Sequence, residues 1–185
     1  MISIIKTLME ASSAVNAPVH EYALLPTGEV VFSPELLESC KTNVCGNYNK
    51  SWTCPPACES PQEQRGKILS YKQILLFTTV HNLEDSFDYD GMTEGRNLHA
   101  ALTAELKKLS GAPVYGAGSC PICKDAEGNN RCAFPAPCPF PEHKIGSIEA
   151  AGINVTELSK AAGIAYNNGP NTVTFFSMAL LNDVN

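Results

Sequence analysis

Eight cysteines in two short segments constrain this 185-residue chain more than any other feature. Both segments are polar and rich in proline, and the second is too long to be an ordinary loop of a compact domain without something to order it. Thiols gathered in this way usually share a covalent bond, a metal ion or a cluster. The first segment, residues 40–58, has the spacing C-x4-C-x8-C-x3-C, and the second, residues 119–146, has C-x2-C-x8-C-x5-C. The cysteines are Cys40, Cys45, Cys54 and Cys58 in the first set, and Cys120, Cys123, Cys132 and Cys138 in the second.

The N-terminal residues indicate the cellular compartment of the protein, and therefore whether its thiols are reduced or oxidised. The start, "MISIIKTLMEASSAVNA", superficially resembles a secretory signal, but Lys6 and Glu10 interrupt the apolar stretch that a signal requires. Residues 1–16 are better read as an amphipathic helix, and we expect a cytoplasmic protein. In that reducing compartment metal or cluster binding is favoured over a disulfide framework, although the even number of cysteines leaves disulfides as an alternative.

The composition limits which classes of protein and which kinds of binding partner fit this chain. A hydrophobic content of 44% and a charged content of 17% predict a folded globular protein, and the length suits one domain, 1–185. The net charge of −6 argues against non-specific nucleic-acid binding, which needs clustered cations. No stretch approaches the roughly 18 apolar residues of a membrane span, so no membrane association is expected. Nothing in the sequence indicates an oligomeric state.

Local patterns predict an α/β (α+β) single domain with one central sheet, packed helices and two cysteine-rich loops. Ser60 and Glu63 form a capping box at the start of a helix, and Gly111 closes another. The run "YKQILLFTTV" is typical of a buried central strand. The elements expected are helices at 1–16, 93–109 and 154–163, a hairpin at 19–33, and strands at 71–80, 112–118 and 171–182.

Either four-cysteine set can ligate a tetrahedral zinc ion or a cubane iron–sulfur cluster. Structural zinc sites commonly use closely spaced cysteine pairs, and only Cys120 and Cys123 form such a pair. Proline follows Cys54, Cys120 and Cys138 directly, as it follows the last cysteine of bacterial ferredoxin motifs. The local pattern therefore favours one or two [4Fe-4S] clusters, with zinc as the alternative and all eight cysteines as ligands.

Three further residues are predicted to lie at the cofactor. Gly116 and Gly118, in "YGAGSC", allow the backbone to pass close to a cluster, so that amide N–H groups can point at its sulfur atoms. Trp52, the only tryptophan, follows Cys45 and precedes Cys54, where an aromatic ring would shield a cluster from water. His143 is the histidine nearest the second set and is an alternative ligand.

Several motifs resemble an uncharacterised family of cysteine-rich proteins described as predicted metal-binding, a domain of unknown function. The stretches are "CGNYNKSWTCPP", "GAGSCPIC", "CPFPEHKIGSIEAAGINVTELSKAAGI" and "NTVTFFSMALL", and the resemblance runs from about residue 20 to the end. The family usually carries one more cysteine before its last Cys-x-x-Pro, a place that Cys132 fills at shifted spacing. The resemblance implies metal or iron–sulfur binding and brings no reaction with it. The matching positions are Cys45, Tyr48, Trp52, Cys54, Pro55, Pro56, Gly116, Gly118, Cys120, Cys123, Cys138, Pro141, Ser147, Glu149, Ala150 and Gly152.

Three functions fit these features. The first is an iron–sulfur protein with a redox or electron-transfer role, which would require a redox partner protein. The second is a zinc protein with a structural or regulatory role. The third is an enzyme in which one cluster lacks its fourth protein ligand and binds substrate at the open iron.

Overall fold

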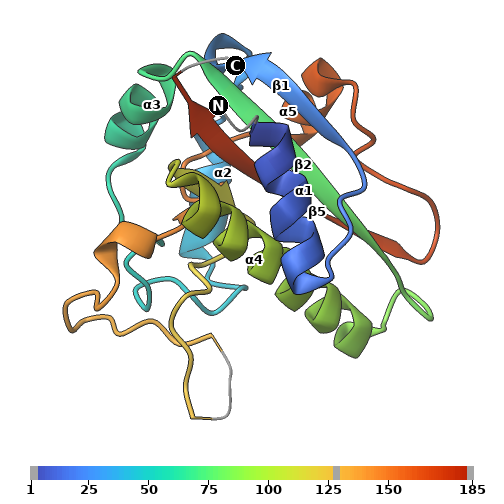
Figure 1. The fold of residues 1–185 in the computed structure, drawn as a ribbon. Helices are drawn as coiled ribbons and strands as arrows, with labels where there is room; N and C mark the ends of the chain where they lie inside the picture. The colour runs from blue at the N-terminus through green and yellow to red at the C-terminus, as the bar shows by residue number, and fades with distance from the viewer. Residues whose placement is uncertain (1–3, 127–129, 183–185) are drawn as a thin grey trace.

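The computed structural model describes residues 4–126 and 130–182, in which five strands form one mixed sheet (Figure 1). The strand order is β1-β2-β5-β3-β4. Neighbouring strands are antiparallel except β3 and β4, which are parallel. The long pairing of β2 with β5 is therefore the centre of the sheet. The bounds are β1 Tyr22–Pro26, β2 Gln73–Asn82, β3 Val114–Gly116, β4 Gly146–Ser147 and β5 Thr172–Leu181.

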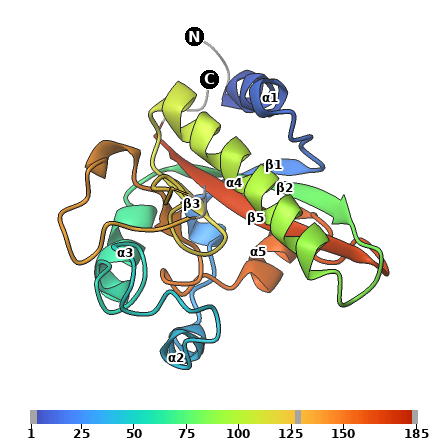
Figure 2. The same cartoon turned by 90° about the horizontal axis from the view of Figure 1, so that it is seen from below.

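Helices cover both faces of the sheet (Figures 1 and 2). On one face α1 and α4 pack against each other and α4 contacts β2 and β5. On the other face lie α3 and α5, which contribute Ile68 and Leu158 to the apolar cluster on that side. The helices are α1 Ile4–Val15, α2 Glu35–Lys41, α3 Pro61–Leu69, α4 Tyr89–Ser110 and α5 Val155–Ala162, with short 3-10 turns η1 Thr27–Glu29 and η2 Pro141–His143.

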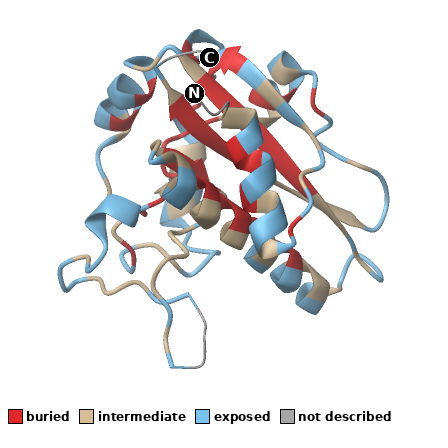
Figure 3. Cartoon of the chain, in the orientation of Figure 1, coloured by how far each residue is buried: buried red, intermediate tan, exposed pale blue. Residues whose placement is uncertain are grey.

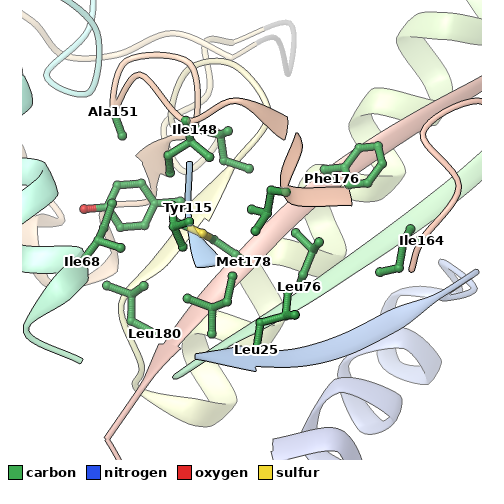
Figure 4. Packing of buried hydrophobic residues seen from close by; sticks show 14 residues of the cluster. Leu25, Ile68, Leu76, Tyr115, Ile148, Ala151, Ile164, Phe176, Met178 and Leu180 are labelled. Atoms are coloured by element: carbon green, nitrogen blue, oxygen red, sulfur yellow. The ribbon is translucent and has the colours of Figure 1, made fainter. Parts of the chain in front are cut away.

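The apolar core consists of two clusters separated by the sheet. Along β2, Leu75 and Phe77 belong to the cluster under α1 and α4, whereas Ile74 and Leu76 belong to the opposite one. A strand buried on both faces needs a continuous apolar run, which β2 has. Figure 3 shows the buried residues concentrated along the sheet, and Figure 4 shows the packing of the cluster that contains Leu76.

The predicted fold class, a single α+β domain, is confirmed, and so is the capping box at α3. The hairpin expected at 19–33 is wrong, because β1 pairs with β2 and Phe32 forms only an isolated bridge with Ile153. Helix α4 begins four residues before the expected start, since the Asp88 side chain accepts the Gly91 amide hydrogen bond and caps it. Among the described residues, no helix has both the length and the apolar content needed to cross a bilayer.

The two cysteine segments occupy the end of the molecule away from the termini. The first connects α2 to α3 and the second connects β3 to β4, with η2 near its end. Both views place the two segments side by side (Figures 1 and 2). The sheet thus brings together two thiol-bearing stretches that are far apart in the sequence.

Candidate metal centre

Trp52 and its neighbour Thr53 join the two cysteine segments. The indole Nε1 of Trp52 donates a hydrogen bond to the Ala136 carbonyl oxygen at 2.9 Å. Its ring packs edge-to-face with that of Phe134, with 4.9 Å between the ring centroids. The Cys120 amide in turn donates to Thr53 Oγ1 at 3.0 Å. These contacts run between residues 52–53 and the second segment, so the two segments form one region of structure.

The four cysteines of the second set line one small cavity of about 10 Å³, with Trp52 also in its wall. Such a volume accommodates roughly one atom of water size. The cysteines in this lining are Cys120, Cys123, Cys132 and Cys138. The fold therefore brings all four members of the second set to the wall of one cavity.

Backbone amides point at the sulfur atoms of this second set. The Ile145 amide donates to Cys120 Sγ at 3.5 Å. Burial raises the pKa of the Cys120 thiol, and the amides of Ile145 and Ile122 act in the opposite direction. Burial likewise raises the pKa of Cys123, opposed by the amide of Ala133. Amide donors of this kind stabilise the thiolate form that a metal requires.

The first set is gathered around Cys54, the one buried cysteine. Burial first, and then the neighbouring thiols of Cys45, Cys58 and Cys40, together raise the pKa of the Cys54 thiol to about 12, opposed by a hydrogen bond with Ser51. The pKa of Cys40 is raised by burial, then by Cys45 and Glu149. The thiol of Cys54 thus interacts electrostatically with each of the other three.

The raised pKa values of the thiols affect how the two cysteine sets would bind a metal cation. A thiol that is protonated at neutral pH must release its proton when it becomes a ligand, so metal binding would release protons. The structure describes all eight cysteines and records each as a free thiol. Clustered free thiols with amide donors fit a soft transition metal or an iron–sulfur cluster. Within residues 4–126 and 130–182, however, no group of three or more Cys, His, Asp or Glu is drawn together tightly enough to form a finished metal site.

The two glycines predicted at the cofactor have other contacts. The Gly118 amide donates to Glu149 Oε2 at 3.0 Å, and this carboxylate also accepts from Ser147 Oγ at 2.8 Å. Gly116 is buried in β3, where an added Cβ would lie 3.3 Å from Thr103 Cγ2. A role for either glycine at a cluster sulfur stays a prediction, and Glu149 emerges as the side chain that holds the turn before Cys120.

A cleft beside the first set was not predicted from the sequence. It has a volume of about 180 Å³, and Cys58 and Trp52 form part of its wall. Its cationic side chains are Lys67, Lys107 and Lys144, which come from α3, α4 and the residues before β4. Because these lysines belong to three separate elements, no local pattern in the sequence indicates that they meet.

The comparisons with known proteins identify the family of the chain. Residues 23–181 match the family model described as "Predicted metal-binding protein (DUF2284)". No curated protein and no solved structure matches the chain. The match spans both cysteine segments and nearly the whole sheet, in agreement with the resemblance seen in the sequence. The chain therefore belongs to the DUF2284 family of predicted metal-binding proteins.

Proposed function

We propose that this protein is an iron–sulfur protein in which each cysteine set holds a [4Fe-4S] cluster and that it has a redox or electron-transfer role with a partner protein. The observation that carries the proposal is the convergence of Cys120, Cys123, Cys132 and Cys138 on one cavity. Membership of a family of predicted metal-binding proteins supports the coarser part, that a metal is bound.

The chain's own residues have defined parts in this proposal. A bound cluster would supply one-electron chemistry, and thiolates would hold it. The Ile145 amide at Cys120 Sγ would favour the more negative, reduced state by donating a hydrogen bond to the ligand. Trp52, held by Ala136 and Phe134, would limit the access of water to both sets.

Zinc is a second candidate, favoured by the size of the cavity in the second set. About 10 Å³ has room for a single ion, whereas a four-iron cluster would require the segment to open around it. A zinc ion ligated by four cysteines would give the protein a structural or regulatory role. The cleft beside Cys58 supports a third candidate, an enzyme in which an open iron position in the first set faces a substrate.

Metal and sulfide analysis of anaerobically purified protein tests the proposal. We expect about four iron and four acid-labile sulfide per occupied set, with broad visible absorbance that dithionite bleaches. Zinc without sulfide in a colourless protein would establish the zinc alternative instead. Protein that contains no stoichiometric transition metal, with its thiols all free or paired in disulfides, would overturn metal binding altogether.

Substitutions assign the ligands. Cys54→Ala and Cys123→Ala are each expected to remove the metal of one set, and Ser119→Ala, next to Cys120, is the matched control that retains both. If Cys40→Ala or Cys58→Ala leaves the metal of the first set in place, the open-iron enzyme is favoured over a fully ligated electron carrier.

A further inference from the structure

The cleft of about 180 Å³ between α3, α4 and the residues before β4 is locally cationic. Lys67, Lys107 and Lys144 line it together with two carboxylates, Glu59 and Glu142. Three ammonium groups against two carboxylates leave one net positive charge, on a chain whose net charge is −6. A cationic hollow in an acidic protein raises the local concentration of small anions.

Two of the three lysines have no carboxylate partner within the described chain. Lys67 lies 3.5 Å from Glu59, but neither Lys107 nor Lys144 is within 4.0 Å of a carboxylate oxygen of a described residue. Lys107 is half-buried, and burial lowers its pKa, opposed by the negative charge of Glu142. The next residue, Lys108, is exposed and pairs with Glu105 at 3.0 Å. A partly desolvated ammonium group without a direct ion pair is stabilised by an anion that contacts it.

Tyr115 adds an unpartnered hydroxyl group to the same wall. Its side chain is 4% exposed and belongs to the apolar cluster, and Figure 4 shows the hydroxyl oxygen at the end of the ring away from Met178. The hydroxyl has no hydrogen-bond partner among the described residues, although Tyr115 lines the cleft. Since this oxygen is not among the fully buried polar atoms without a partner, it reaches the cleft, where it can donate a hydrogen bond. An acceptor in the cleft would provide its partner.

We propose that this cleft binds a small metabolite that carries a carboxylate or phosphate group. Its oxyanion would lie between Lys107, Lys144 and the Tyr115 hydroxyl, and its carbon skeleton would contact Trp52 and Pro113. The volume, about 180 Å³, is below the roughly 300–1,000 Å³ of sites for drug-sized ligands, so the ligand is small. The site requires no metal, so it goes beyond the proposed iron–sulfur function and does not depend on the open-iron enzyme for which the same cleft is a candidate substrate site.

Titration with inorganic phosphate and with succinate, each at constant ionic strength, tests the site. Binding is followed by calorimetry and by the emission of Trp52, the only tryptophan, which lies in the cleft wall. We expect saturable binding that Lys107→Gln weakens about tenfold, since a charge-assisted hydrogen bond is lost. Lys108→Gln, the same charge change one residue away, is expected to leave the affinity within about twofold, in line with an exposed ion pair.

A second variant, Tyr115→Phe, and a comparison of metal-loaded with metal-free protein complete the test. Tyr115→Phe preserves the ring that packs in the core and removes only the oxygen, so weaker binding with an unchanged melting temperature supports the site. Tighter binding of succinate than of phosphate assigns an organic acid, and the reverse order assigns a phosphate compound. No saturable binding of either probe, or equal weakening by Lys107→Gln and Lys108→Gln, overturns the proposal. The titrations are made on metal-loaded and metal-free protein, so failure of the metal proposal leaves this result readable.

Discussion

At the scale of single residues, His99 is a buried titratable group whose pKa is strongly lowered. It is 2% exposed, between α4 and the sheet. Its Nδ1 lies 2.9 Å from Thr79 Oγ1 and its Nε2 lies 2.8 Å from Ser177 Oγ. Thr103 Oγ1 lies 2.9 Å from the same Ser177 oxygen. Both ring nitrogens therefore have hydroxyl partners, and the neutral imidazole is fully satisfied as part of the core.

This burial predicts a loss of stability in acid. Burial lowers the pKa of His99 to about 3, whereas the unfolded chain has the ordinary value of about 6.5. Between these values the unfolded state binds a proton that the folded state does not, so stability falls as the pH drops below about 6.5. From pH 7 to pH 5 we expect His99 to contribute a loss of about 2 kcal/mol in the free energy of unfolding, measured by urea denaturation.

Two substitutions isolate the contribution of this residue. His99→Gln is expected to be less stable at pH 7 but to lose clearly less stability than the wild type between pH 7 and pH 5. His20→Gln, which removes an exposed imidazole outside the core, serves as the control substitution. Identical pH dependence in His99→Gln and wild type would contradict the assignment.

At the scale of elements, the close approach of β4 to β3 depends on a glycine. A Cβ on Gly146 would lie 2.6 Å from Tyr115 Cδ1, and the buried ring has no room to move. Gly146→Ala is therefore expected to lower the free energy of unfolding by about 1–3 kcal/mol. Gly66 in α3 has no atom within 4 Å of its added Cβ, so Gly66→Ala is expected to raise it by about 0.5–1 kcal/mol. Thermal and urea denaturation measure both, and equal effects of the two variants would be inconsistent with this packing.

The elements also show which features a sequence can predict. Helix ends were predictable because their signals are local: Ser60 and Glu63 exchange the hydrogen bonds of a capping box, and Gly111 closes α4 in the left-handed conformation. The pairing of strands, in contrast, does not depend on local sequence signals. The turn at Pro26–Gly28 suggested a hairpin, yet β1 gains more by pairing with the apolar strand β2, and η1 leads the chain away instead.

The candidate site likewise has a part that the sequence predicts and a part that it does not. The cysteines are visible in the sequence, because each set lies within one segment and its spacing can be read directly. The cationic cleft depends on Lys67 and Lys144 being brought together across the fold, and the roles of Thr53 and Ala136 depend on two segments meeting. These contacts are products of the sheet topology, which the sequence alone does not specify.

At the scale of the whole molecule, the apolar core and the cysteine segments are stabilised by separate interactions. None of the eight cysteines, all of which the structure describes, belongs to either apolar cluster. Figure 3 shows the cysteine segments largely intermediate or exposed, in contrast to the sheet. The sheet and its helices therefore have their own hydrophobic stabilisation. The segments depend on the contacts of Trp52 and Thr53, and on a metal if one is bound.

This separation predicts a local response to metal removal. Anaerobic stripping of the metal is expected to raise hydrogen exchange in residues 40–58 and 119–146, because ligation contributes folding free energy to the segments that hold the ligands. Amides of β2 and β5 should keep their protection, since the two apolar clusters that enclose them contain no thiol. Mass spectrometry of exchanged, digested protein measures both regions in one sample, and reloading the metal should restore the segments. Faster exchange in β2 and β5 after stripping would mean that the metal supports the entire fold. Unchanged exchange in both segments would mean that the contacts between Trp52, Phe134 and Ala136 are enough to hold them.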